Sequence, residues 1–178
     1  MTMTLDLSYP VGRFDRTAAW TAASRAGALE EIAALPSRMH DAVAGLSDAQ
    51  LDTPYRPGGW TVRQLVHHVA DSHLNAYTRF KLGLTEEAPQ IKPYEEARWA
   101  ELPDVGAVPI DVSLRLLDAL HERWVALLRA LTPEQFARTV QHPEHAQPMS
   151  LDRLLMLYAW HGRHHVAHVT GLREREGW

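Results

Sequence analysis

The chain has no cysteine among its 178 residues. This absence excludes disulfide bonds, thiolate metal ligands and a cysteine nucleophile, so any metal site must use histidine or carboxylate side chains. Long apolar runs are also missing, because nowhere do about 18 apolar residues follow one another as a membrane-spanning helix requires. The stretch 1–11 lacks the basic start and apolar core of a signal peptide. We therefore expect a cytoplasmic protein with no membrane partner.

Clusters of basic residues are scarce as well. Eighteen lysines and arginines stand against 22 acidic residues, which gives a formal net charge of -4. No segment concentrates the positive charge that would neutralise a phosphate backbone, so we do not expect a nucleic-acid partner. The apolar share of 46% and the charged share of 22% are typical of a globular protein. The length suits one domain that covers residues 1–178.

The spacing of apolar residues predicts four substantial helices and no convincing strand. These helices cover about residues 17–45, 61–84 and 112–131, and about 24 residues after Ser150. Pro36 is expected to kink the first helix or divide it. Thr61 with Gln64 forms a capping-box pattern, and Ser150 is a second predicted N-cap. The pattern predicts an all-α, antiparallel four-helix bundle with a long crossover connection, residues 85–111, between helices 2 and 3.

Histidine is abundant, and four of the 11 histidines lie between residues 161 and 168. Positions 154, 158, 161, 165, 168 and 172 have the spacing of a seam that faces the core. On a helical wheel His165 lies near the centre of the apolar face and His161 close to it, while His168 lies toward the edge and His164 faces away. Histidines four residues apart can reach one ion at N–metal distances of about 2.0 to 2.1 Å.

Packed histidines are the alternative to a metal site. A single core-facing histidine is usually just hydrogen-bonded, but several in one seam all need partners, and one metal satisfies several at once. The predicted second helix offers three more histidines. Its wheel puts His73 in the middle of the apolar face, His68 on a polar border and His67 near Asp71 on the far side. Periodicity alone favours His73 as a third ligand, although it equally fits a hydrogen-bonded core residue.

Short motifs in a fixed order carry a family resemblance across nearly the whole chain. They are LSYP at 7–10, GGWTVRQ at 58–64, HHVADSH at 67–73, IKPY at 91–94, WH at 160–161 and GW at 177–178. In combination and in this order they resemble the YfiT branch of the DinB-like family. The resemblance implies a four-helix bundle, a homodimer and one divalent metal per chain, zinc or alternatively nickel, held by three histidines.

The resemblance also implies which histidines bind the metal. In that family the ligand on the second helix precedes an apolar-Ala-Asp step, which here selects His68 rather than His73. The ligands on the last helix follow the tryptophan and stand four residues later, which selects His161 and His165. The neighbouring His67, His73, His164 and His168 stay as alternatives.

The function implied by the resemblance is that of a metal-dependent hydrolase. Three histidines leave an open coordination position, at which a small-molecule substrate could meet an activated water or thiol. Related members are thiol S-transferases that use bacillithiol or a similar low-molecular-weight thiol, so stress-related thiol transfer is the alternative. A non-catalytic, metal-stabilised bundle that binds a ligand is another. Asp71 is a weak candidate for a base or for a residue that orients an imidazole.

Overall fold

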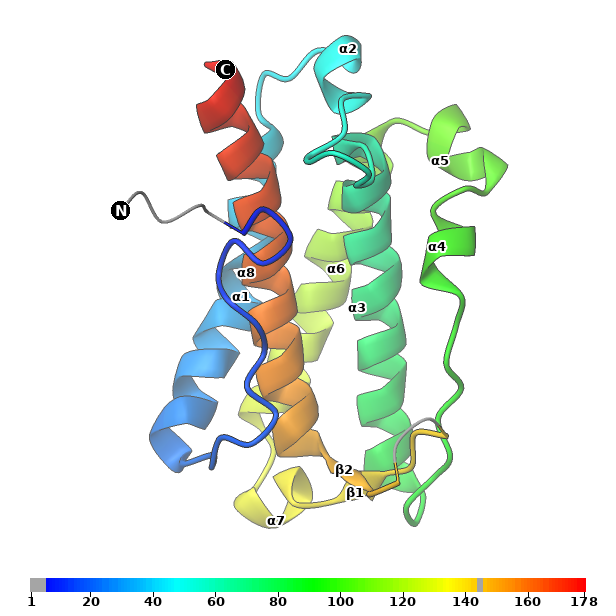
Figure 1. Cartoon of the computed structure of the whole chain (residues 1–178). Helices are drawn as coiled ribbons and strands as arrows, with labels where there is room; N and C mark the ends of the chain where they lie inside the picture. Colours follow the sequence, from blue (N-terminus) through cyan, green and yellow to red (C-terminus); the bar gives the residue numbers. More distant parts are fainter. Residues whose placement is uncertain (1–5, 144–145) are drawn as a thin grey trace.

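The protein is a helical bundle with a very small sheet (Figure 1), and the computed structural model describes residues 6–143 and 146–178. Part of the stretch 1–11, in which we found no signal-peptide pattern, therefore lies outside the described residues. In chain order the elements are α1 (Ala22–Val43), α2 (Asp48–Leu51), α3 (Val62–Thr85), α4 (Glu96–Trp99), α5 (Pro103–Ala107), α6 (Ile110–Arg129), α7 (Pro133–Phe136), β1 (Thr139–Val140), β2 (Met149–Ser150) and α8 (Leu151–Glu176).

The four long helices confirm the predicted bundle, but their directions are not simply alternating. Contacts between matching ends show that α1 runs parallel to α8: Arg25 pairs with Asp152 near their first turns, and Arg173 bonds the carbonyl of Ala42 near their last turns. Helices α3 and α6 are also parallel, whereas α3 and α8 are antiparallel (Figure 1). The predicted antiparallel bundle with a long crossover is confirmed as a four-helix bundle, and the two parallel pairs arise because the crossover returns the chain to the end at which α3 began.

The crossover and the caps follow from the local sequence. Residues 86–109 form the connection between α3 and α6, and they contain the short helices α4 and α5, which the periodicity did not predict. The capping box of Thr61 and Gln64 is present, and Ser150 accepts from the backbone N–H of Arg153. Helix α1 begins at Ala22, later than expected, and continues through Pro36 without dividing. The antiparallel pair β1–β2, two residues in each strand, was not predicted either.

A layer of histidines crosses the interior and separates two apolar clusters. One cluster includes Phe80, Trp124 and Leu154, and the other includes Leu65 and Leu117. The buried histidines lie between them along α3, α6 and α8; they are His67, His68, His73, His121, His165 and His168. No helix within the described ranges combines the length and apolar character needed to span a bilayer.

Helices α1 and α8 pack closely against each other at the level of this histidine layer. Gly162, next to the histidine at 161, is buried, and a Cβ there would lie 2.9 Å from a methyl carbon of Leu35. The glycine therefore lets the two helices approach at the level of the histidines, which no larger residue would allow without displacing Leu35.

We expect Gly162→Leu to lower the free energy of unfolding by about 1 to 2 kcal/mol, because overpacking at α1–α8 outweighs the gain in helix propensity. Gly27→Ala is the matched control, since Gly27 is exposed on α1 and has no atom near the position of an added Cβ. That control should raise stability by roughly 0.5 to 1 kcal/mol. Denaturant unfolding of both variants measures the effect, and an unchanged midpoint for Gly162→Leu would contradict the close-approach argument.

Candidate metal centre

Three imidazoles from two helices converge at one point of the histidine layer. His68 comes from α3, and His161 and His165 come from successive turns of α8. The Nε2 atom of His161 lies 3.3 Å from Nε2 of His68 and 3.1 Å from Nε2 of His165. One ligand atom from each of the three histidines lies within 4.8 Å of the other two. The structure thus brings together the three histidines that the family resemblance selected.

The spacing of these nitrogens fits a metal ion. Two nitrogens that occupy corners of a tetrahedron at about 2.05 Å from a zinc ion are separated by about 3.3 Å. The two N···N distances, 3.3 and 3.1 Å, are close to this value. Three Nε2 lone pairs that face one another also need a shared electrophile, because a proton on one of them can serve only one neighbour. The donor set therefore suits one divalent ion with a position left open.

Burial keeps these imidazoles neutral. It lowers the pKa of His68 to about 4. Burial also holds the pKa of His161 and of His165 well below the usual value, and positive charge on neighbouring imidazoles would lower it further. At neutral pH each of the three rings is therefore neutral and keeps one nitrogen lone pair. A metal ion does not have to displace a second proton in order to bind there.

Two cavities lie beside the three histidines, and His161 lines both of them. One, of about 420 Å³, is lined by residues that include Arg56, Trp60, His68, His161 and His165. The other, of about 570 Å³, is lined by residues that include Ser72, Arg79, Tyr94, Tyr158 and His161. His161 and Glu96 line both cavities. The open side of the site is therefore a two-lobed cleft rather than a sealed pocket.

The remaining histidines that the sequence left open lie around this group. His73 is fully buried and contacts His161 from behind, with its Nε2 3.2 Å from the His161 Nδ1. His67 is turned toward α6, where its Nδ1 lies 2.7 Å from the Ser113 hydroxyl. His164 and His168 face each other, with 3.0 Å between their Nε2 atoms. The helical wheel predicted that His164 faces away from the seam. That prediction was wrong, because His164 is half-buried and lines the smaller cavity.

Asp71 lies away from both cavities. Burial and the negative charge of Asp104 raise the pKa of Asp71 to about 6. Its carboxylate is not among the side chains that line the cleft, and within the described residues no imidazole is hydrogen-bonded to it. Asp71 therefore lies on the α3–α5 side of the bundle. Its pKa is raised there by burial and by Asp104, and not by a group of the metal centre.

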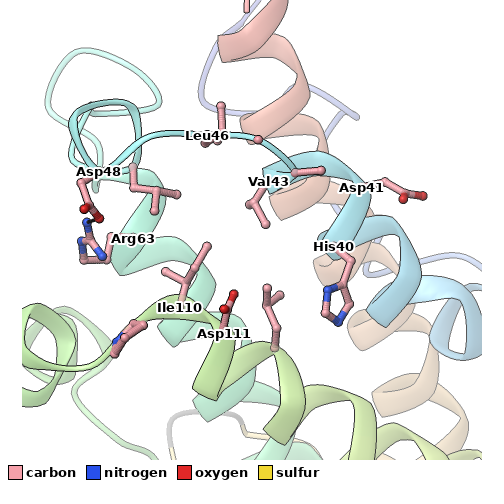
Figure 2. Close-up of a pocket in the computed structure, with 13 residues that line it drawn as sticks. His40, Asp41, Val43, Leu46, Asp48, Arg63, Ile110 and Asp111 are labelled. Carbon is pink, nitrogen blue, oxygen red and sulfur yellow. Dashed lines mark hydrogen bonds and ion pairs between the residues drawn. The ribbon is translucent and has the colours of Figure 1, made fainter.

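A separate cavity of about 470 Å³ lies at the end of the bundle where α1 ends and α3 and α6 begin (Figure 2). In Figure 2, Arg63 is turned toward Asp48, with which it forms an ion pair at 2.8 Å. His40 supplies the one imidazole in this lining, and it contacts Asp118 at 3.0 Å. None of the three converging histidines lines this cavity, and among the described residues its histidine and aspartates do not converge as a group of metal donors.

Two residues at or near the site were missed from the sequence. His121 lies in the seam 117, 121, 124, 128 of α6, whose spacing is the same signal that identified the histidines of α8. Applying that rule to every helix would have found it. Glu96 stands in the irregular crossover, where no periodic pattern marks it, and the structure alone brings it to the cleft.

Comparison with known proteins agrees with this architecture. Relatives from Bacillus mycoides (strain KBAB4) and Bacillus cereus (strain B4264), both named "Putative metal-dependent hydrolase", are 53% identical over 173 residues, which is 97% of this chain and 99% of each relative. A solved structure, that of YfiT from Bacillus subtilis, is described as "a probable metal-dependent hydrolase with an unusual four-helix bundle topology". It matches with a TM-score of 0.93 and 48% identity over 97% of this chain and 98% of YfiT. The DinB superfamily profile matches residues 31–169. The chain therefore belongs to the DinB superfamily, as its ordered motifs predicted.

Proposed function

We propose that the protein is a metal-dependent hydrolase in which His68, His161 and His165 hold one divalent ion through their Nε2 atoms. The convergence of these three atoms at the junction of two cavities carries the proposal. The names of the relatives in Bacillus point the same way. Such an ion supplies Lewis acidity, which activates water, or a thiol, as a nucleophile near neutral pH and polarises a carbonyl group. Zinc is our first choice and nickel the second, because imidazole suits both.

The larger lobe of the cleft is suited to an anionic group of the substrate. Arg79 donates to the Tyr158 hydroxyl at 2.9 Å and to the carbonyl of Lys92 at 3.3 Å. Among the described residues, no carboxylate forms an ion pair with this guanidinium. An arginine that lines a cavity with unused donors binds carboxylates well, and its neighbours here hold it in place. We therefore infer a substrate whose scissile group lies at the histidines and whose carboxylate reaches Arg79.

Glu96 is the better placed of the acidic candidates for moving a proton. It lines both lobes of the cleft, so a nucleophile entering from either side passes it. A carboxylate there could accept the proton of the nucleophile and return it to the leaving group. Asp71 remains a candidate only for an indirect effect, because it does not line the cleft.

Thiol transfer is the second candidate, and the two-lobed cleft is the observation that favours it. One lobe could hold a low-molecular-weight thiol and the other an electrophile, with His161 between them. The thiol sulfur would bond to the electrophilic carbon, the bond to the leaving group would break, and the thiol proton would pass to that group. A non-catalytic ligand-binding bundle would use the same cavities without turnover.

We also propose a homodimer. Leu74 on α3 and Val112 and Leu116 on α6 are large apolar side chains that stay exposed on two neighbouring helices. Large apolar side chains that stay exposed on neighbouring helices are candidates for a contact surface between copies of the chain.

Protein purified without added metal should contain close to one transition-metal ion per chain, because three preorganised neutral imidazoles bind such ions well. Elemental analysis of the purified protein measures this. A content below about a tenth of an equivalent, with no uptake of added zinc or nickel, would refute the proposed site.

His68→Ala, His161→Ala and His165→Ala should each lose the metal, since two imidazoles leave an incomplete set of ligands. His164→Ala is the matched control, because His164 lines the same cavity but its Nε2 faces His168. It should keep its metal. Circular dichroism checks that each variant is folded. Equal metal loss in all four folded variants would show that the ligand assignment is misplaced.

Arg79→Leu should raise KM about tenfold or more for an aryl ester with a carboxylate on its acyl chain, because a charge-assisted hydrogen bond contributes about 1.5 to 3 kcal/mol. The KM of the matching aryl ester without the carboxylate, a neutral ester, should not change. Arg123→Leu is the control, since Arg123 lies over Tyr77 and lines neither lobe. Equal effects on both esters would exclude Arg79 as the carboxylate contact.

The same assays distinguish the candidate reactions. Each ester is tested alone, and a thiol is tested with an electrophile, with and without a chelator. Chelator-sensitive turnover of an ester alone supports the hydrolase. Turnover that requires the thiol supports the transferase, and the absence of both supports the binding bundle.

A further inference from the structure

A file of three hydrogen bonds, one partly buried and two buried, extends from His161 away from the cleft. The Nδ1 of His161 lies 3.2 Å from Nε2 of His73, and Nδ1 of His73 lies 3.0 Å from Nε2 of His121. The Nδ1 of His121 lies 2.7 Å from the carbonyl oxygen of Ile32. His73 and His121 are 0% and 2% exposed, so solvent cannot replace any of these contacts. The file connects α8, α3, α6 and α1 at one level of the bundle.

The carbonyl at the end of the file gives it a single direction. A carbonyl oxygen only accepts, so Nδ1 of His121 must carry the proton, and Nε2 of this neutral ring must accept. Nδ1 of His73 must then donate to His121, which leaves Nε2 of His73 as an acceptor. Nδ1 of His161 must in turn donate to His73. The Nε2 atom of His161 is consequently left with its lone pair, directed at His68 and His165.

Pro36 explains why the Ile32 carbonyl is available inside a helix. In α1 the carbonyl of Ile32 would normally accept from the backbone N–H four residues later, and that residue is Pro36, which has none. The proline thus removes a competing donor at the point where His121 bonds. The cost of a proline inside a helix is offset here by a contact that reaches the site through two histidines.

His165 shows what a ring without such support looks like. Its Nδ1 is buried and has no hydrogen-bond partner among the described residues. Its Nε2 faces Nε2 of His161, so within the described residues the hydrogen-bond contact of this ring is to another proposed ligand and not to a group outside the site. Of the two proposed ligands on α8, His161 is the one whose protonation pattern is set from outside the site.

We propose that His73 and His121 are positioning residues, which, anchored on the Ile32 carbonyl, hold His161 in the tautomer that keeps Nε2 free for a metal ion. The proposal rests on the proposed function in that His161 is taken as a ligand. The protonation pattern itself is a property of the metal-free protein, so it can be tested separately.

The first experiment uses the full-length, metal-free protein at neutral pH and measures imidazole ¹⁵N chemical shifts with ¹H–¹⁵N correlation spectra. Single-histidine variants assign the signals. We expect His121, His73 and His161 all to carry the proton on Nδ1. A proton on Nε2 of His161, or a mixture of both forms, would overturn the proposal even if the protein binds metal well. If the expected pattern is found but the protein binds no metal, the role of the hydrogen-bonded file is supported and the proposed function is refuted instead.

The second experiment measures zinc affinity by competition with a chromophoric chelator. His121→Leu removes the anchor, so we expect zinc to bind about 10 to 100 times more weakly, as is typical when a residue supporting a ligand is lost. Because the contacts act in series, His73→Leu combined with His121→Leu should bind zinc no more weakly than His73→Leu alone. Additive losses of zinc affinity in the double variant, or an unchanged affinity in His121→Leu, would contradict the proposed role of the file.

Leu117→Ala is the control for a merely structural effect. Leu117 is buried on the same helix, one turn before His121, and its apolar side chain takes no part in the hydrogen bonds of the file. This variant should lose stability but keep its zinc affinity and its Nδ1 proton on His161. If Leu117→Ala changes its zinc affinity or the proton position on His161, loosened packing and not the loss of the file explains the weaker zinc binding of the histidine variants. If His121→Leu does not fold, the spectra of the wild-type protein still decide the question.

Discussion

The need to satisfy buried imidazole nitrogens governs this bundle. Each neutral imidazole brings one donor and one acceptor into the core, and an unmet one costs about 1 to 3 kcal/mol. Here the histidines meet that need mainly through one another, in a layer that lies between two apolar clusters. Three Nε2 atoms in the layer are left facing a common point at the cleft. The proposed metal would complete the layer rather than sit in a pocket added to it.

The topology follows from this layer. His67 meets Ser113 near the first turns of α3 and α6, and His73 meets His121 near their middles, an order of contacts that only parallel helices allow. The long crossover achieves this by returning the chain to the starting end of α3, and it also brings Glu96 to the cleft. Gly162 and Pro36 belong to the same arrangement, because one lets α1 approach α8 and the other frees a carbonyl of α1 for His121.

The sequence predicted the features that depend on local patterns. The seam of α8, the capping box at Thr61 and the cap at Ser150 are all local, and the structure contains them. The parallel pairing of helices could not be predicted in this way, because helix direction depends on the path of the crossover. Nor could periodicity predict the short helices α4 and α5, each five residues or fewer, which are too short to display a repeat.

The choice between His68 and His73 shows what a helical wheel measures. The wheel finds the residue that points most directly into the core, and it found His73, which is 0% exposed. A metal that must meet a substrate needs ligands at the border of the core, where one coordination position can open to a cleft. His68 lies on that border and lines the smaller cavity, whereas His73 lines neither lobe of the cleft. On α3 the centre of the apolar face therefore holds a residue that contacts a ligand, and its polar edge holds the proposed ligand itself. The family motif contained this distinction, which the periodicity of a single helix cannot express.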